Sequence, residues 1–215
     1  ASQYIDQWFV RSHYELTYVN QSYGVPLDRI SIIPLSPRIP IIDQYPEKED
    51  FCFHLSSLAD GRKNVMRLVQ AAIKYHFKLV LAGSVNSDAA FSPIKSLIDT
   101  HDNISYLGRV PDAELYHLYA RAKVFALPSI NEGVGMVAVE AASYGCDIVV
   151  TEIGGPKEYY GSRAFVVNPY DVDEIGKAVV AAMVEKEYQP QLMKEINEKY
   201  SLPRCVAQLA EEYSK

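Results

Sequence analysis

The sequence predicts an α/β fold in which a parallel sheet is covered by helices on both faces. Short, almost continuously apolar runs alternate with amphipathic helical patterns from about residue 51 onward. Such runs are typical of strands buried on both faces, and helices between them are typical of the crossovers of a parallel sheet. The expected strands are 51–55, 78–83, 104–108, 124–128, 147–151 and 164–167.

The residues before this region predict a helix followed by a connector. Apolar side chains recur at roughly helical spacing over residues 2–22, and the Tyr-Gly-Val-Pro sequence at 23–26 is a helix stop. Residues 30–50 hold four prolines, which exclude a regular element and favour a semi-rigid extended segment. We therefore expect a helix and linker over residues 1–50 and one α/β domain over residues 51–215.

The last of the helices expected between and after the strands is the most clearly delimited. Asp171 is a suitable N-cap, and Glu174 follows three residues later. Apolar residues from Val172 to Met183 then line one helix face. The expected helices are 64–75, 93–100, 112–122, 136–144 and 171–184.

Composition limits the classes of function. A chain of 215 residues with 48% hydrophobic residues is large enough for one substantial domain with a core. A net charge of −6, and tyrosines that form no stacking ladder, argue against nucleic acid as a partner. The scattered Cys52, Cys146 and Cys205 indicate neither a disulfide framework nor a zinc site, so we expect buried thiols in a reducing compartment. Because the chain begins with Ala1 rather than Met, we expect a fragment of a longer protein.

The loops that follow the strands are where a ligand is expected. In an open α/β sheet, ligands bind beyond the carboxyl ends of the strands. The loop after strand 124–128 carries Gly133 and Gly135, which let the backbone approach a ligand, and the helix from Met136 offers unpaired N–H groups. This pattern predicts an anion site. Glu132 in the same loop would repel phosphate unless it binds hydroxyl groups instead.

A second carboxylate narrows the class of ligand. Glu140 lies on the same expected helix and suits a vicinal diol, because a carboxylate accepts two hydrogen bonds. Arg62 and Lys63, in the loop after the first strand, supply positive charge for a diphosphate. A nucleoside diphosphate sugar satisfies all of these features.

Plainer interpretations stand beside these. Glu132 and Glu140 are also compatible with solvated carboxylates, and Arg62 and Lys63 with an ordinary basic first turn of a helix. His54 ends the first strand and is either a functional group or a histidine at the edge of the core. For Gly154 and Gly155 the alternatives are a tight turn and a ligand contact.

The run "EGVGMVAVEA" resembles the E-x7-E motif of the retaining glycosyltransferases of family 4, with Glu132 and Glu140 at the required spacing. The segments "YGVPLDRISIIP", "RKNVMRLVQA", "KLVLAG" and "VVTEIGGPKEYYG" follow the order of the C-terminal half of such enzymes, so the resemblance covers the chain from about residue 22. It implies a GT-B enzyme with two Rossmann-like domains facing a cleft. This chain would be the donor-binding domain, and residues 1–22 the helix leading out of a missing N-terminal domain.

The resemblance also implies roles for individual residues. It places Glu132 on the donor sugar hydroxyls, Glu140 on the ribose, and Lys63 with Arg62 on the phosphates. Glu132, Lys63 and Arg62 are then the catalytic candidates. The remaining donor-binding candidates are Gly133, Gly135, Met136, Val137 and Val110. The resemblance places Val110 where the backbone meets the base, and a packing residue is the alternative.

Two departures from the family pattern bear on these roles. The arginine usual after the first strand is represented by Ser56 or Ser57, which leaves open whether Arg62 replaces it. The usual Asn-Gly after the linker strand is replaced by Leu35-Ser36, which puts an acceptor-side role of this segment in doubt.

The implied reaction is a retaining transfer in which the enzyme stabilises charge on the leaving diphosphate. No metal and no cofactor is expected, since Asp171 to Asp173 reads as a helix cap rather than a metal-binding loop. The expected partners are the sugar nucleotide and, through the missing domain, an acceptor glycan or lipid. The expected location is the cytoplasm, with peripheral contact at the inner membrane face through the missing domain.

Other functions remain open. A sugar-nucleotide epimerase shares this architecture, although the family-4 spacing disfavours it. A non-catalytic module that binds nucleotide sugars would have the same residues. A dinucleotide oxidoreductase is a less favoured alternative, because no G-x-G-x-x-G follows any expected strand.

Overall fold

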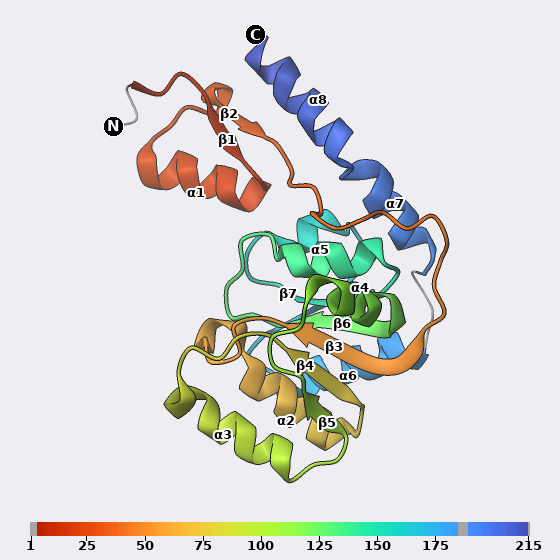
Figure 1. Cartoon of the computed structure of the whole chain (residues 1–215). Helices are drawn as coiled ribbons and strands as arrows, with labels where there is room; N and C mark the ends of the chain where they lie inside the picture. Colours follow the sequence, from red (N-terminus) through yellow and green to blue (C-terminus); the bar gives the residue numbers. More distant parts are fainter. Residues whose placement is uncertain (1–3, 185–188, 215) are drawn as a thin grey trace.

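The predicted fold class is confirmed by a computed structural model, which describes residues 4–184 and 189–214. Six parallel strands form one sheet in the order β5-β4-β3-β6-β7-β8 (Figure 1). Every neighbouring pair in this sheet is parallel. The strands are β3 (Glu49–Leu55), β4 (Leu79–Ala82), β5 (Ile104–Tyr106), β6 (Ala122–Leu127), β7 (Asp147–Thr151) and β8 (Phe165–Val167).

Helices cover both faces of the sheet because successive strand residues point to opposite sides. Phe53 of β3 joins the core under one set of helices, whereas Cys52 joins the core under the other. The first set is α4 (Asp112–Arg121), α5 (Met136–Ser143) and α7 (Gln191–Lys199). The second set is α2 (Val65–Tyr75), α3 (Asp88–Asp99) and α6 (Val172–Val184).

The helix predictions hold with two differences. As expected, Asp171 caps α6, since its Oδ1 accepts hydrogen bonds from the N–H groups of Asp173 at 2.8 Å and Glu174 at 3.1 Å. α3 begins at Asp88 after the N-cap Ser87, so Pro93 lies inside the helix and not at its start. α7 and α8 (Leu202–Tyr213) were not predicted, although both are amphipathic: Leu192, Met193 and Ile196 in α7, and Leu202, Cys205, Val206 and Leu209 in α8, recur at helical spacing.

The expected single helix over residues 2–22 is wrong. In the described part of this range, from residue 4, a strand β1 (Trp8–Val10) comes first, then the N-cap Ser12 and helix α1 (His13–Tyr23). β1 pairs in parallel with β2 (Ile30–Ile32), which lies inside the segment expected to hold no regular element. That expectation failed because the prolines begin only at Pro34, so residues 30–32 keep their N–H groups for pairing.

The β1–α1–β2 unit has a small core of its own, formed by Val10, Val19, Val25 and Ile30. Helix α8 runs back beside this unit (Figure 1), where the rings of Tyr213 and Phe9 lie 5.3 Å apart. The domain boundary at residue 50 stays a prediction. The three cysteines are free and buried, as expected.

Candidate functional site

The candidate site lies where the sheet order reverses. From β3 the chain continues to β4 on one side, whereas β6, on the other side of β3, leads to β7. The carboxyl ends of β3 and β6 therefore flank the switch point of the sheet, the usual ligand position in such sheets. We call the space between the loops that follow these two strands the crevice. The 3₁₀ helix η3 (Gly61–Lys63) follows β3, and the loop 128–135 follows β6. Ile130 N donates a hydrogen bond of 2.8 Å to Arg62 O, so the two loops lie against each other.

Lys63 and Glu132 meet in this crevice. Lys63 Nζ lies 2.6 Å from Glu132 Oε2, and the side chains are 25% and 15% exposed. The hydroxyl of Ser129 also donates to Glu132 Oε2, at 3.3 Å. A partly shielded ion pair of this kind holds the carboxylate in one position, because both partners restrict its rotation. The structure thus brings together two of the three predicted catalytic candidates.

Arg62, the third candidate, is placed differently. Its Nη2 lies 2.7 Å from Asp60 Oδ2, and its side chain is 77% exposed. Its Nε also donates to Asp60 Oδ1, at 3.2 Å. Arg62 therefore faces solvent at the rim of the crevice, paired with a carboxylate two residues away.

The Glu132 loop is held by a second glycine loop. Gly154 forms a parallel bridge with Glu132, and Gly155 N donates to Gly133 O at 3.1 Å. A Cβ at Gly154 would lie 2.0 Å from Glu132 O, and the residue has φ +102°. Gly154 therefore serves a close backbone approach that no other residue permits, and it acts on the candidate site through the Glu132 loop.

The same loop turns into α5 at Gly135. This residue has φ +71°, and a Cβ there would lie 2.8 Å from Leu127 Cδ2. Met136 and Val137 form the first helical turn and pack partly against the core, as does the more distant Val110. Because α5 follows the loop after β6, its first N–H groups, which have no acceptor within the helix, lie at the carboxyl end of the sheet, where an anion site is expected.

Glu140 lies on the same helix but in other surroundings. Tyr119 of α4 donates its hydroxyl to Glu140 Oε2 at 3.2 Å. Burial raises the pKa of Glu140, while the bonds from Tyr119 and from the Arg38 backbone act in the opposite direction. The two glutamates thus have different partners, one a lysine and the other a tyrosine that the sequence did not single out.

His54 is a fully buried residue at the end of β3. Its Nδ1 lies 2.7 Å from Ala126 O, and its Nε2 lies 2.7 Å from Ser56 Oγ. A carbonyl can only accept, so Nδ1 carries the proton and Nε2 accepts from the serine. Burial lowers the pKa of His54 to about 4. The ring is therefore neutral and structural, which favours the plainer interpretation.

Asn64 is a further site residue that the sequence reading missed. It is buried in the left-handed conformation, φ 60°, between η3 and α2. Its Nδ2 donates to Pro128 O at 2.8 Å and to Pro169 O at 2.7 Å. It therefore ties the loop of Lys63 to the loop of Glu132. The available signal was an asparagine directly after a basic pair, since asparagine tolerates this conformation better than most residues.

Two kinds of feature are absent from the part of the chain that the structure describes. Groups of three or more His, Cys, Asp or Glu side chains that could hold a metal ion are absent there. In the same residues, every helix is too short or too polar to cross a lipid bilayer.

The family follows from a comparison with family models. The model described as glycosyl transferases group 1 matches residues 39–199, which is most of the chain. The chain belongs to this family. The matched residues of this group 1 glycosyltransferase chain include both loops of the crevice and the helix that carries Glu140.

Relatives of this glycosyltransferase chain include enzymes named for mannosyl transfer. O-antigen chain mannosyltransferase B of Escherichia coli is 27% identical over 199 residues, which cover 83% of this chain and 51% of that protein. O-antigen chain mannosyltransferase RfbU of Salmonella typhimurium LT2 is 29% identical over 162 residues, covering 71% and 44%. The chain thus spans about half the length of these relatives.

Solved structures share the fold of this glycosyltransferase chain. Anabaena Alr3699/HepE in complex with UDP and glucose matches with a TM-score of 0.84 at 18% identity, over all of this chain and 64% of that one. Sucrose-phosphate synthase from Thermosynechococcus elongatus matches with a TM-score of 0.81 at 18% identity, over 99% and 59%.

Proposed function

We propose that this chain is the donor-binding domain of a retaining family-4 glycosyltransferase. It binds a nucleoside diphosphate sugar, and in a longer protein the sugar is transferred with retention to an acceptor hydroxyl. The observation that carries the proposal is the Lys63–Glu132 pair, 2.6 Å apart at the switch point of the sheet. A lysine there can neutralise a diphosphate, and the adjacent carboxylate can accept from sugar hydroxyls.

The other candidates have roles consistent with their placement. The N–H groups at Gly133, Gly135 and the start of α5 would stabilise charge on the leaving diphosphate. Glu140 would accept from the ribose hydroxyls, next to the Tyr119 hydroxyl. Arg62 would have to leave Asp60 to reach a phosphate. Val110 would meet the base.

The class of sugar and acceptor is inferred from the relatives. Two relatives are named as O-antigen chain mannosyltransferases, which supports a hexose as the transferred group and a glycan as the acceptor. A structural neighbour solved with UDP and glucose supports a nucleoside diphosphate donor. We place the acceptor site in an N-terminal domain outside this chain and the protein in the cytoplasm, with no metal or cofactor in the reaction.

The proposal predicts binding without transfer. The chain is expected to bind a nucleoside diphosphate, because both loops of the crevice are present, but to form no glycoside without the acceptor domain. A thermal-shift screen with UDP, GDP, ADP and their sugars tests the binding, and an assay for glycoside formation tests the absence of transfer. A ligand at about 100 times its Kd adds about 2.7 kcal/mol to the free energy of unfolding.

The outcomes separate the competing functions. Stabilisation by one nucleotide family with no turnover supports the donor domain over the epimerase and the oxidoreductase, and turnover by the full-length protein then distinguishes it from a non-catalytic binding module. Steady formation of a glycoside by the purified chain would contradict the need for a second domain. Conversion of one sugar nucleotide into its epimer would favour the epimerase, and stabilisation by NAD alone would favour an oxidoreductase.

A charge variant tests the phosphate contact. Lys63→Ala is expected to weaken diphosphate binding about tenfold relative to the nucleoside, because a charge-assisted hydrogen bond is lost. The difference should shrink as salt rises, since the side chain is 25% exposed and its charge is partly screened. Isothermal calorimetry at low and high salt measures both effects.

Arg62→Ala is the matched control, one residue away and 77% exposed. A smaller loss than for Lys63→Ala is expected, because Arg62 already pairs with Asp60. Equal diphosphate affinity in Lys63→Ala and the parent chain at low salt would move the phosphate site out of this loop.

A further inference from the structure

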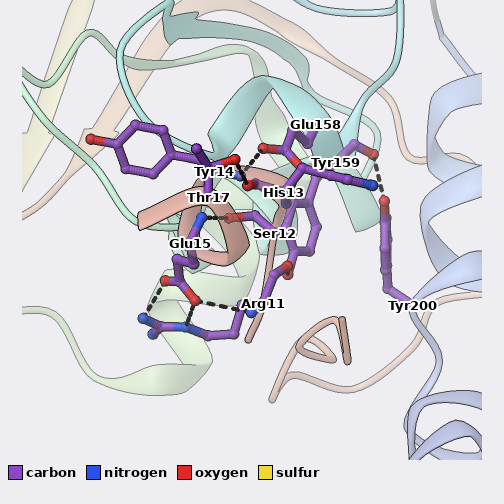
Figure 2. A network of polar contacts seen from close by, with 9 residues as sticks. All are labelled: Arg11, Ser12, His13, Tyr14, Glu15, Thr17, Glu158, Tyr159 and Tyr200. Carbon is purple, nitrogen blue, oxygen red and sulfur yellow. Dashed lines mark hydrogen bonds and ion pairs between the residues drawn. The ribbon is translucent and has the colours of Figure 1, made fainter. Parts of the chain in front are cut away.

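Glu158 caps a helix from a distant part of the chain. It lies in the 3₁₀ helix η4 (Pro156–Tyr159), which follows the second glycine loop. Its Oε2 accepts from His13 N at 2.7 Å, and its Oε1 accepts from Tyr14 N at 2.9 Å (Figure 2). The next N–H group, that of Glu15, is taken by the local N-cap Ser12 at 3.2 Å. The first turn of α1 is thus capped mainly by a residue 145 positions away.

Tyr159 holds the same unit at two more points. Its hydroxyl donates to Arg11 O at 3.1 Å, just before α1. The same hydroxyl accepts from Leu35 N at 3.2 Å, just after β2. Its own carbonyl accepts from the hydroxyl of Tyr200 at 3.1 Å, and the two rings lie 4.7 Å apart. η4 therefore forms hydrogen bonds to the start of α1 and to the residues that flank the β1–α1–β2 unit.

The start of α1 also lies directly on the two glycine loops. A Cβ at Gly155 would lie 2.7 Å from Ser12 Oγ, and one at Gly133 would lie 3.5 Å from Glu15 Oε1. Figure 2 shows Glu15 paired with Arg11 beside this turn. Gly155 in turn bonds the Glu132 loop through Gly133 O. A continuous set of tight contacts thus joins the candidate donor site to α1.

We propose that Glu158 is a positioning residue that couples nucleotide binding at the Glu132 loop to the placement of the β1–α1–β2 unit. The claim that a nucleotide binds at the Glu132 loop rests on the proposed function. A diphosphate at Gly133 and Gly135 changes the position of the loop that contacts Gly155 and Ser12. Because a Cβ at Gly155 would lie 2.5 Å from Gly133 O and 2.7 Å from Ser12 Oγ, Gly155 packs tightly between the Glu132 loop and the start of α1, and that change reaches η4 and α1 together. The carboxylate of Glu158 keeps the first turn of α1 attached to η4 while it moves.

Amide hydrogen exchange measures this coupling residue by residue. In the parent chain, the amides of His13 and Tyr14 are expected to exchange slowly, and more slowly still with UDP or GDP present. In Glu158→Ala both amides should exchange about tenfold faster, the loss expected for one charged hydrogen bond. Adding nucleotide should no longer slow them, although the variant still binds the nucleotide. Glu158→Gln keeps one acceptor oxygen and should show an intermediate response.

Glu152→Ala is the matched control, an exposed carboxylate six positions earlier on the other side of the glycine pair. It should leave both the basal exchange and the nucleotide effect unchanged. If Glu158→Ala exchanges faster but keeps the nucleotide effect, Glu158 is only a structural cap and the coupling is refuted. If exchange does not change at all, the cap itself is refuted. If none of UDP, GDP and ADP binds the parent chain, the proposed function fails and the coupling fails with it.

Discussion

Acidification from pH 7 to pH 4 is expected to lower the free energy of unfolding by about 3 kcal/mol through His54 alone. The folded state holds this ring neutral, with its pKa lowered from 6.5 to about 4 by burial and, to a smaller extent, by Lys63. Between pH 6.5 and pH 4, the His54 side chain binds a proton in the unfolded chain but not in the folded chain. Stability is therefore lost as the pH falls from 6.5 through 4.

Comparing the pH dependence of stability in the parent chain and in His54→Asn isolates the contribution of His54. His54→Asn keeps a donor for the Ala126 carbonyl and does not titrate. Urea unfolding at several pH values should give a steeper decline for the parent chain than for His54→Asn. The comparison is needed because Glu140, whose pKa is raised by burial, contributes in the opposite direction as the pH falls. Parallel stability curves for the two proteins would show that the pKa of His54 is not lowered in the folded state.

The second large effect is expected when each glutamate is replaced, because we assign Glu140 and Glu132 to different parts of the donor. The two variants should therefore lose affinity for different ligands. Glu140→Ala is expected to weaken binding of the bare nucleoside diphosphate by roughly 1.5–3 kcal/mol, because the ribose loses a charged acceptor. Glu132→Ala should leave the bare diphosphate nearly unchanged and weaken the sugar-bearing donor. Calorimetry with both ligands measures the four affinities.

Tyr119→Phe is the control for Glu140, because it removes the 3.2 Å hydrogen bond and keeps the carboxylate. It should cost less nucleotide affinity than Glu140→Ala. Equal losses for both ligands in both glutamate variants would refute the assignment of Glu132 to the sugar and Glu140 to the ribose.

The N-terminal region shows where short-range patterns fail. Residues 2–22 have apolar side chains at roughly helical spacing, yet Trp8–Val10 form a strand. A three-residue strand is too short to show a periodicity of its own, and its pairing with Ile30–Ile32 decides the outcome. The glycine pair is a related case. Gly154 was equally compatible with a simple turn, and its role is visible only from the Glu132 carbonyl beside it.

The sequence by itself determined the alternation of strands and helices, and with it the parallel sheet and the edge where a ligand is expected. It also determined the spacing of Glu132 and Glu140, since both lie within one loop and the helix that follows it. The tertiary structure alone decided that Lys63 faces Glu132, that Tyr119 faces Glu140 and that Glu158 caps α1. These partners are far apart in the chain, and they meet because of strand order and packing, which local propensity and periodicity do not encode.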